Sequence, residues 1–245
     1  MPTNKSPSGK KRSVAKRPLA ERTAATPRTK SELSAGAFDA AACWARIERW
    51  FVEHHPELDL ELRPGAKEKE IDAAETRLGV TFPADFRASL RVHDGQDDEP
   101  RLFLLPFSER LGSLKSMVAC SKSDRPSYDA RDTEGRFEWL DDSRRVRQVH
   151  FHPKHVAFAG RKYWDHGRLM FDFVPGPEGR AGQIIALADV DFVFVCSSFG
   201  ELLERTASGL EQGAITLEAA GYDYVRLRYG SRRGEEPVTA AAFFG

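Results

Sequence analysis

The sequence predicts an α+β domain in which helices flank a central, mostly antiparallel sheet. Three short apolar runs, at residues 168–174, 183–187 and 192–195, are separated by turn-forming Gly, Pro and Asp residues. The links between the runs are too short for helical crossovers, so neighbouring strands are expected to be antiparallel. A helix over residues 199–210 follows, because apolar residues recur there at helical spacing after Ser197 or Ser198 as the cap.

The first part of the chain favours helices. Asp39 can cap a first helix, whose apolar residues fall on one face. A second helix is expected to end at Gly79, and a third to begin at Pro83 and end near Asp94. Between the first two, alternating apolar and polar residues over 58–62 predict a short strand.

The remaining elements are predicted from shorter patterns. Strands are expected at residues 101–107 and 149–158, and a helix over residues 111–118. The polar stretch 122–147 is predicted to be a long surface loop. Alternation over residues 222–229 predicts a late strand, placed at the edge of its sheet.

Composition divides the chain into a tail, a body and a second tail. Residues 1–30 hold nine Lys or Arg and one acidic residue, which leaves the other 215 with 28 basic and 36 acidic residues. Residues 1–36 contain few large apolar groups and are predicted to be a disordered basic tail. One domain is expected over residues 37–230, followed by a C-terminal tail over 231–245.

Cysteine use and hydropathy favour a cytoplasmic protein. Cys43, Cys120 and Cys196 are widely spaced and odd in number, which argues against a disulfide framework. No apolar run approaches the roughly 20 residues of a membrane span, so no membrane contact is expected. The basic tail lacks interleaved aromatic residues, so nucleic acid is not the expected partner.

Histidines near the middle of the chain are the candidate metal ligands. On a strand, His150 and His152 share a face, and His155 or Asp165 could complete a site. However, Pro153 interrupts the strand and the spacing fits no common zinc pattern. Packing positions on a sheet face explain these histidines as well, so no metal and no other cofactor are expected.

No catalytic constellation stands out. Ser197 and Ser198 lie at a strand-to-helix junction but lack the G-x-S-x-G pattern of a nucleophile elbow, and N-capping explains them. Cys196 ends an apolar run and is interpreted as a buried thiol. The chain is therefore predicted not to be an enzyme.

Two blocks of residues occur in an order typical of a known family. The first is Pro64-Gly65-Ala66, Ile71, Glu75, Leu78-Gly79, Pro83, Phe86, Leu90 and His93-Asp94-Gly95-Gln96. The second is Leu169-Met170-Phe171-Asp172, Pro175, Gly179, Gly182-Gln183-Ile184-Ile185, Ser198-Phe199 and Leu202-Leu203. Together they resemble the SUKH superfamily, in the branch typified by the fungal Smi/Knr cell-wall regulators, and many bacterial members of that superfamily are immunity proteins for secreted toxins.

The resemblance implies a SUKH-like α+β fold that acts by protein–protein binding without catalysis. It also implies a mainly structural role for Glu75, Gly79, Pro83, Asp94, Gly95, Asp172 and Gly182. One departure is local: where the family has Trp-x-Pro-x-Ala, this chain has the segment His155-Val156-Ala157-Phe158-Ala159.

On this basis the chain is expected to be an immunity protein that binds and neutralises a toxin. An acidic face would speed association with a basic partner, and one aromatic side chain would anchor the complex. The residues expected to contact the partner are Asp94, Asp97, Asp98, Glu99, Trp139, Asp141 and Asp142.

Two alternatives remain open. The chain could be a regulatory or scaffold protein whose basic tail engages an acidic partner or nucleic acid. It could also be a metal-dependent enzyme that uses His150, His152 and Asp165.

Overall fold

A computed structural model describes most of the chain after residue 37. The described residues are 38–106, 109–124, 144–147, 149, 152–160, 167–188, 191–219, 224–230 and 243. Contacts divide the chain into residues 1–37 and 38–245, and all described elements belong to the second unit. The predicted tails therefore lie outside the described residues, apart from Phe243.

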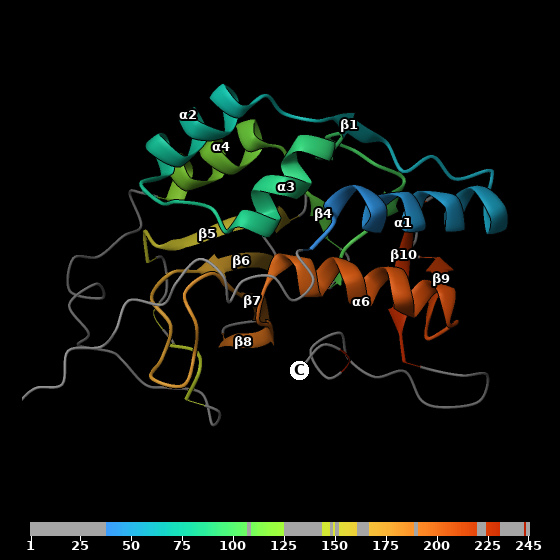
Figure 1. Cartoon of the computed structure of the whole chain (residues 1–245). Coiled ribbons are helices and arrows are strands. Elements are labelled where there is room, and N and C mark those ends of the chain that lie inside the picture. Colours follow the sequence, from blue (N-terminus) through green and yellow to red (C-terminus); the bar gives the residue numbers. More distant parts are fainter. Residues whose placement is uncertain are drawn as a thin grey trace, which may run out of the picture. The chain divides into compact units, whose positions relative to one another are not determined.

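Five antiparallel strands form the largest described sheet (Figure 1). They are β4 (Arg110–Leu111), β5 (His155–Gly160), β6 (Arg168–Asp172), β7 (Gln183–Ala188) and β8 (Asp191–Cys196), in that order across the sheet. The last three are the apolar runs predicted from the sequence. Their antiparallel order confirms the predicted meander and, together with the helices, the α+β class.

The described helices are α1 (Ala40–His54), α2 (Glu68–Leu78), α3 (Ala84–Val92), α4 (Leu114–Asp124) and α6 (Phe199–Glu211). Three of their ends follow the predicted signals. The Asp39 carboxylate caps α1 by accepting from the Ala42 amide at 3.0 Å, and Gly79 ends α2 with a left-handed φ of 71°. Ser198 caps α6 as expected.

Two smaller sheets complete the described fold. One pairs β1 (Leu62–Pro64) with β2 (His93–Gln96), and the other has the order β3 (Leu102–Phe103), β10 (Val225–Tyr229), β9 (Ile215–Ala219). The prediction of an edge position for the last strand was wrong, because β10 lies between β3 and β9.

The strand predicted over residues 58–62 was also wrong, since β1 begins only at Leu62. Its alternation is interrupted by a turn in which the Asp59 carboxylate accepts from the Glu61 amide at 2.8 Å. Glu61 also has a φ of 51°, which is incompatible with extended backbone.

Aromatic side chains join the helices to one face of the five-stranded sheet. The Phe86 ring of α3 lies 4.6 Å from Phe171 of β6 and 4.9 Å from Phe199 of α6, measured between ring centroids. Helix α1 packs beside α6 and α3 (Figure 1). The helical layer is therefore fixed to the sheet through one continuous apolar core.

The opposite face of the sheet is also buried. Neighbouring residues of a strand point to opposite faces, so Met170 lies on this side while Phe171 faces the helices. A second cluster here joins Cys120, Val146, Met170, Ile185 and Phe192. Within the described part of the chain, no helix has both the length and the apolar character that a membrane crossing requires.

Candidate functional site

The loop after β2 carries three of the acidic residues expected to contact a partner. Asp97, Asp98 and Glu99 are exposed. Two of them face arginines: Arg63 lies 3.3 Å from the Asp97 carboxylate, and Arg110 lies 3.6 Å from that of Asp98. The loop is therefore an exposed surface of mixed charge.

Asp94, the fourth predicted contact in this region, has a role inside the fold. Its half-buried carboxylate accepts a 2.7 Å hydrogen bond from the Leu114 amide in the first turn of α4. Burial raises the pKa of Asp94, and the hydrogen bond from Leu114 opposes that shift. The bond connects β2 to the start of α4.

Two neighbours of Asp94 strengthen this connection. The Gln96 side-chain amide donates to the Leu60 and Leu102 carbonyls, each at 2.9 Å, and its oxygen accepts from the Leu111 amide at 3.1 Å. Gly95 has a φ of 80°, and a Cβ there would lie 2.6 Å from the backbone of Gly112. Strand β2 is thus held tightly against the segment that leads into α4.

Beside this junction lies a charged cavity of about 510 Å³. It is lined by parts of β1, β4, β6 and α4 together with the loop after β2. The charged lining residues are Arg63, Arg110, Lys115, Arg168, Asp98 and Asp124. With four cations and two carboxylates, the lining has a formal charge of +2.

Two arginines of the cavity pair with carboxylates that differ in exposure. Arg168 forms a 2.5 Å ion pair with Asp124, and both side chains are largely buried. The Arg110 side chain is only 3% exposed, whereas Asp98, its partner at 3.6 Å, is 75% exposed. Burial lowers the pKa of Arg110, and the charges of Asp98 and Glu109 oppose the shift. A buried cation therefore faces the cavity beside a counter-ion that lies mostly in solvent.

The remaining predicted contacts, Trp139, Asp141 and Asp142, lie outside the described residues, so they stay predictions. The same applies to His150 and Asp165 of the metal hypothesis. Within the described part of the chain, no three His, Cys, Asp or Glu side chains are grouped so that they could hold a metal ion.

The two described histidines of that hypothesis are packed into the fold. The His155 ring is buried, stands edge-on to the Phe192 ring at 5.2 Å and lies 3.4 Å from the Asp172 carboxylate. Asp172 is fully buried, and its carboxylate accepts a hydrogen bond from the Gln183 side-chain amide at 2.9 Å. Burial, the larger cause, and the charge of His155 lower the pKa of His152 to about 4. His152 is therefore neutral near pH 7.

The groups considered for nucleophilic catalysis are structural. The Ser198 hydroxyl accepts from the Glu201 amide at 3.1 Å, which confirms it as the cap of α6. Burial raises the pKa of Cys196 well above its usual value, so the thiol stays protonated.

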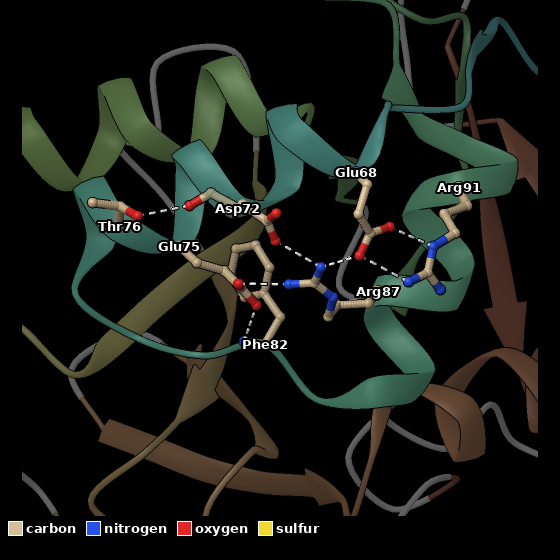
Figure 2. A network of polar contacts seen from close by, with 7 residues as sticks. All are labelled: Glu68, Asp72, Glu75, Thr76, Phe82, Arg87 and Arg91. Atoms are coloured by element: carbon tan, nitrogen blue, oxygen red, sulfur yellow. Dashed lines mark hydrogen bonds and ion pairs between the residues drawn. The ribbon is translucent and has the colours of Figure 1, made fainter.

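A network of charged side chains joins α2 to α3 (Figure 2). The Arg87 guanidinium contacts Glu75 at 2.5 Å, Asp72 at 2.8 Å and also Glu68. The second Glu75 oxygen accepts from the Phe82 amide at 2.7 Å, just before α3. Glu75 therefore has a structural role inside the fold, as the resemblance implies.

Sequence reasoning missed the cations of the cavity. Arg63, Arg110, Lys115 and Arg168 belong to separate segments, and none lies in a motif. The only local signal was the nearby acidic run, which supplies Asp98 to the same cavity.

Comparison with known proteins gives one family match. The model of the SMI1 / KNR4 family (SUKH-1) matches residues 65–205, which contain α2, α3, α4 and the whole five-stranded sheet.

Several proteins are similar to this chain, among them the following three. The cell wall biosynthesis/cell cycle regulator smi1 of Schizosaccharomyces pombe is 30% identical over 202 residues, covering 78% of this chain and 40% of that protein. The glucan synthesis regulatory protein of Neurospora crassa is 28% identical, covering 71% and 38%. The cell wall assembly regulator SMI1 of Saccharomyces cerevisiae is 27% identical, covering 80% and 45%. This chain thus spans less than half the length of each of these relatives.

Proposed function

The chain belongs to the SMI1/KNR4 (SUKH-1) family, and from this premise we propose that it is a non-catalytic regulatory domain that acts by binding another protein. The family match over residues 65–205 carries the proposal. The described side chains of catalytic types add support, because Asp172, Ser198 and Cys196 are all engaged inside the fold.

The names of the relatives favour a regulatory role. All three are named as regulators, of cell-wall biosynthesis, glucan synthesis or cell-wall assembly. Because the similarity covers only part of each relative, the shared region is proposed to be the binding domain and not the complete regulator. The basic segment of residues 1–36 would add electrostatic attraction to an acidic partner.

A second candidate partner is a toxin, which would make the chain an immunity protein. The observation in its favour is the exposed run Asp97, Asp98 and Glu99, a surface that could attract a basic nuclease-like domain. The arginines opposite Asp97 and Asp98 reduce this attraction. The regulatory role is therefore our primary proposal.

The decisive experiment is capture of a partner followed by reconstitution from purified components. The full chain would be cross-linked to its partners in its own cells, and the partner would then be titrated against the purified chain. We expect saturable binding and no turnover of small molecules. Turnover that is lost in Asp172→Asn, with the fold retained by circular dichroism, would overturn the proposal.

Two variants distinguish the candidates. Deletion of residues 1–36 should weaken a binder that depends on the tail and flatten its salt dependence, but leave an immunity protein active. Asp98→Lys should reduce rescue from a co-expressed basic toxin, whereas Glu53→Lys, on the exposed surface of α1, should not. Rescue by the wild-type chain would establish the immunity function in place of the regulatory one.

A further inference from the structure

We propose that the outer face of the small sheet β3–β10–β9 is the surface on which the domain binds an acidic, extended segment of its protein partner. Tyr224 would pack against an apolar side chain of that segment, and Arg228 would bind a carboxylate four residues further along it. This inference rests on the proposed function, because it assumes that the partner is a protein, and it names the surface and the chemistry of the contact.

The two faces of this sheet have different surroundings. Leu227 and Tyr229 of β10 are buried in the main apolar core. Because neighbouring residues of a strand point to opposite faces, Arg226 and Arg228 point away from that core. The register of the three strands then defines the outer face by Phe103, Thr216, Glu218, Tyr224, Arg226 and Arg228.

An aromatic pair lies at one end of the outer face. The Tyr224 ring, directly before β10, stacks on the Phe103 ring of β3 with 5.4 Å between centroids and 21° between planes. Tyr224 is 37% exposed, and within the described part of the chain only Val52 is another large apolar side chain of such exposure. Tyrosine is enriched among residues that carry binding energy in protein interfaces. The stack holds the ring in place, so binding an apolar side chain on it costs little ordering of Tyr224.

A guanidinium with an unsatisfied donor lies further along β10. The Nε–H of Arg228 is buried and has no hydrogen-bond acceptor. A buried donor without a partner costs free energy, which an acceptor supplied by a ligand would recover. A carboxylate suits this group best, because it can accept two parallel hydrogen bonds from one guanidinium and also matches its charge.

The carboxylates found near this face serve other groups. Glu218 lies opposite Arg226 in the register and pairs with it at 2.6 Å. Beside the aromatic pair, the Glu61 carboxylate accepts from the Arg101 amide at 3.0 Å, next to the exposed Arg101 side chain. Arg226 and Arg101 therefore have acidic neighbours, and the proposal uses neither. Arg228 has no such ion pair among the described residues.

The spacing of Tyr224 and Arg228 favours an extended partner segment. The two residues are four positions apart, which is about 13 Å at the roughly 3.3 Å rise of a strand. An extended segment has the same rise, so side chains four positions apart in it can meet both groups at once. Residues four positions apart in a helix are separated by only about 6 Å along its axis, too little to reach both.

The test uses the full chain labelled with ¹⁵N and a capped peptide of seven residues. This peptide has Tyr at its second position, Glu at its sixth, and Thr or Val elsewhere. One control peptide replaces the Glu by Gln. The other has the same composition but places Tyr and Glu next to each other, so its charge is unchanged while its spacing no longer fits.

We expect the first peptide to cause saturable shifts of the Arg228 Nε–H signal and of the amides of β10. Each control peptide should bind at least about fivefold more weakly. Arg228→Lys, which keeps the charge but lacks the Nε donor, and Tyr224→Ala should each weaken binding about three- to tenfold. Arg49→Lys and Val52→Ala, at exposed positions of α1, are the matched controls and should change it less than twofold.

Several results would overturn the inference. These are no binding of the first peptide, equal affinities for the two acidic peptides, shifts that are not centred on β3, β10 and β9, or an Arg228→Lys affinity equal to that of the wild type. Because Tyr224 is exposed, Tyr224→Ala keeps the test valid if Arg228→Lys fails to fold.

The captured partner separates this inference from the proposed function. A protein partner whose binding is unaffected by Tyr224→Ala and Arg228→Lys would overturn the inference and leave the proposed function intact. Failure to capture any protein partner would count against the proposed function, whatever the peptides show.

Discussion

The Asp94 carboxylate and the Leu114 amide are joined by a 2.7 Å hydrogen bond across twenty positions of the sequence. Leu114 begins α4, where the first backbone amides have no partner within the helix. Asp94 satisfies one of them from the neighbouring β2. Since α4 supplies Lys115 and Asp124 to the charged cavity, this bond also fixes one wall of the cavity relative to another.

Replacing Asp94 by Ala should lower the free energy of unfolding by about 1–2 kcal/mol, because a helix-start amide loses its acceptor. Asp94→Asn should cost less, since an amide oxygen can still accept and the cost of burying a charge disappears. Urea unfolding monitored by circular dichroism measures the free energy of unfolding of both Asp94 variants. Asp97→Ala is the matched control and should stay within about 0.5 kcal/mol. Equal losses for Asp94→Ala and Asp97→Ala would contradict the assigned role.

Gln96 should be more sensitive than its size suggests. Gln96→Met keeps the volume but removes the partners of the Leu60 and Leu102 carbonyls and the Leu111 amide, all in the interior. We expect a loss of about 3 kcal/mol or more in the free energy of unfolding. Gln212→Met, at an exposed position after α6, should have little effect. A Gln96→Met protein as stable as wild type would show that water or rearrangement replaces these bonds.

Elements that depend on neighbouring residues could be predicted from the sequence. Asp39, and either Ser197 or Ser198, were identified as caps because capping needs only a side-chain oxygen and an amide two or three residues later. Gly79 ends α2 for a similar local reason, its left-handed backbone. The meander β6–β7–β8 followed from short turns, which leave antiparallel pairing as the available choice.

Elements that depend on residues far away in the sequence could not be predicted from it. The third helix was expected to continue to Asp94, but α3 ends at Val92 because His93 enters β2 and pairs with Pro64. Strand β10 is internal because Val225 pairs with Leu102 in a parallel register. A local sequence pattern cannot predict pairing with a strand that lies more than a hundred residues away.

The charged cavity could not be predicted from the sequence for the same reason. None of its charged residues belongs to a motif in the sequence, and only the fold, in which α4 packs beside β5 between β4 and β6, places them together. The acidic run after β2 was recognised from the sequence. However, Arg63 and Arg110 lie opposite it, so the surface has mixed charge and is not purely acidic.

The network around Arg87 predicts a stability loss in acid that depends on Glu68. Hydrogen bonds from Arg91, the larger cause, and from Arg87 lower the pKa of Glu68 from an ordinary value of 4.5 to about 2. Between these values the unfolded chain binds the proton more readily than the folded one, so stability falls as the pH drops from about 4.5 to 2. Glu68→Gln should reduce this dependence, measured as the urea midpoint at pH 7, 4 and 3.

The control is Glu53→Gln on the exposed surface of α1, which should retain the wild-type pH dependence. If the Glu68→Gln and wild-type midpoints remain parallel down to pH 3, the ion pairs with Arg87 and Arg91 do not contribute to stability.

His152 should produce a second loss of stability at higher pH. Its Nδ1 accepts a 3.0 Å hydrogen bond from the Lys154 amide, which requires the neutral ring. Burial, and after it the charge of His155, keep the folded-state pKa of His152 at about 4, below the ordinary value of 6.5. The unfolded chain therefore gains a proton before the folded one does, and stability falls as the pH drops from about 6.5 to 4.

His152→Asn tests this directly, because the Asn side-chain oxygen can accept the same hydrogen bond but does not titrate. The variant should lose less stability than wild type between pH 7 and pH 4.5, measured by urea unfolding at half-unit intervals. His54→Asn, on the exposed end of α1, controls for the general effect of removing a histidine. The difference between the His152→Asn and wild-type curves isolates His152 from His155 and the other titrating groups. A difference that stays constant over this range would mean that His152 has the same pKa in the folded and unfolded chain, and that its burial does not hold the ring neutral.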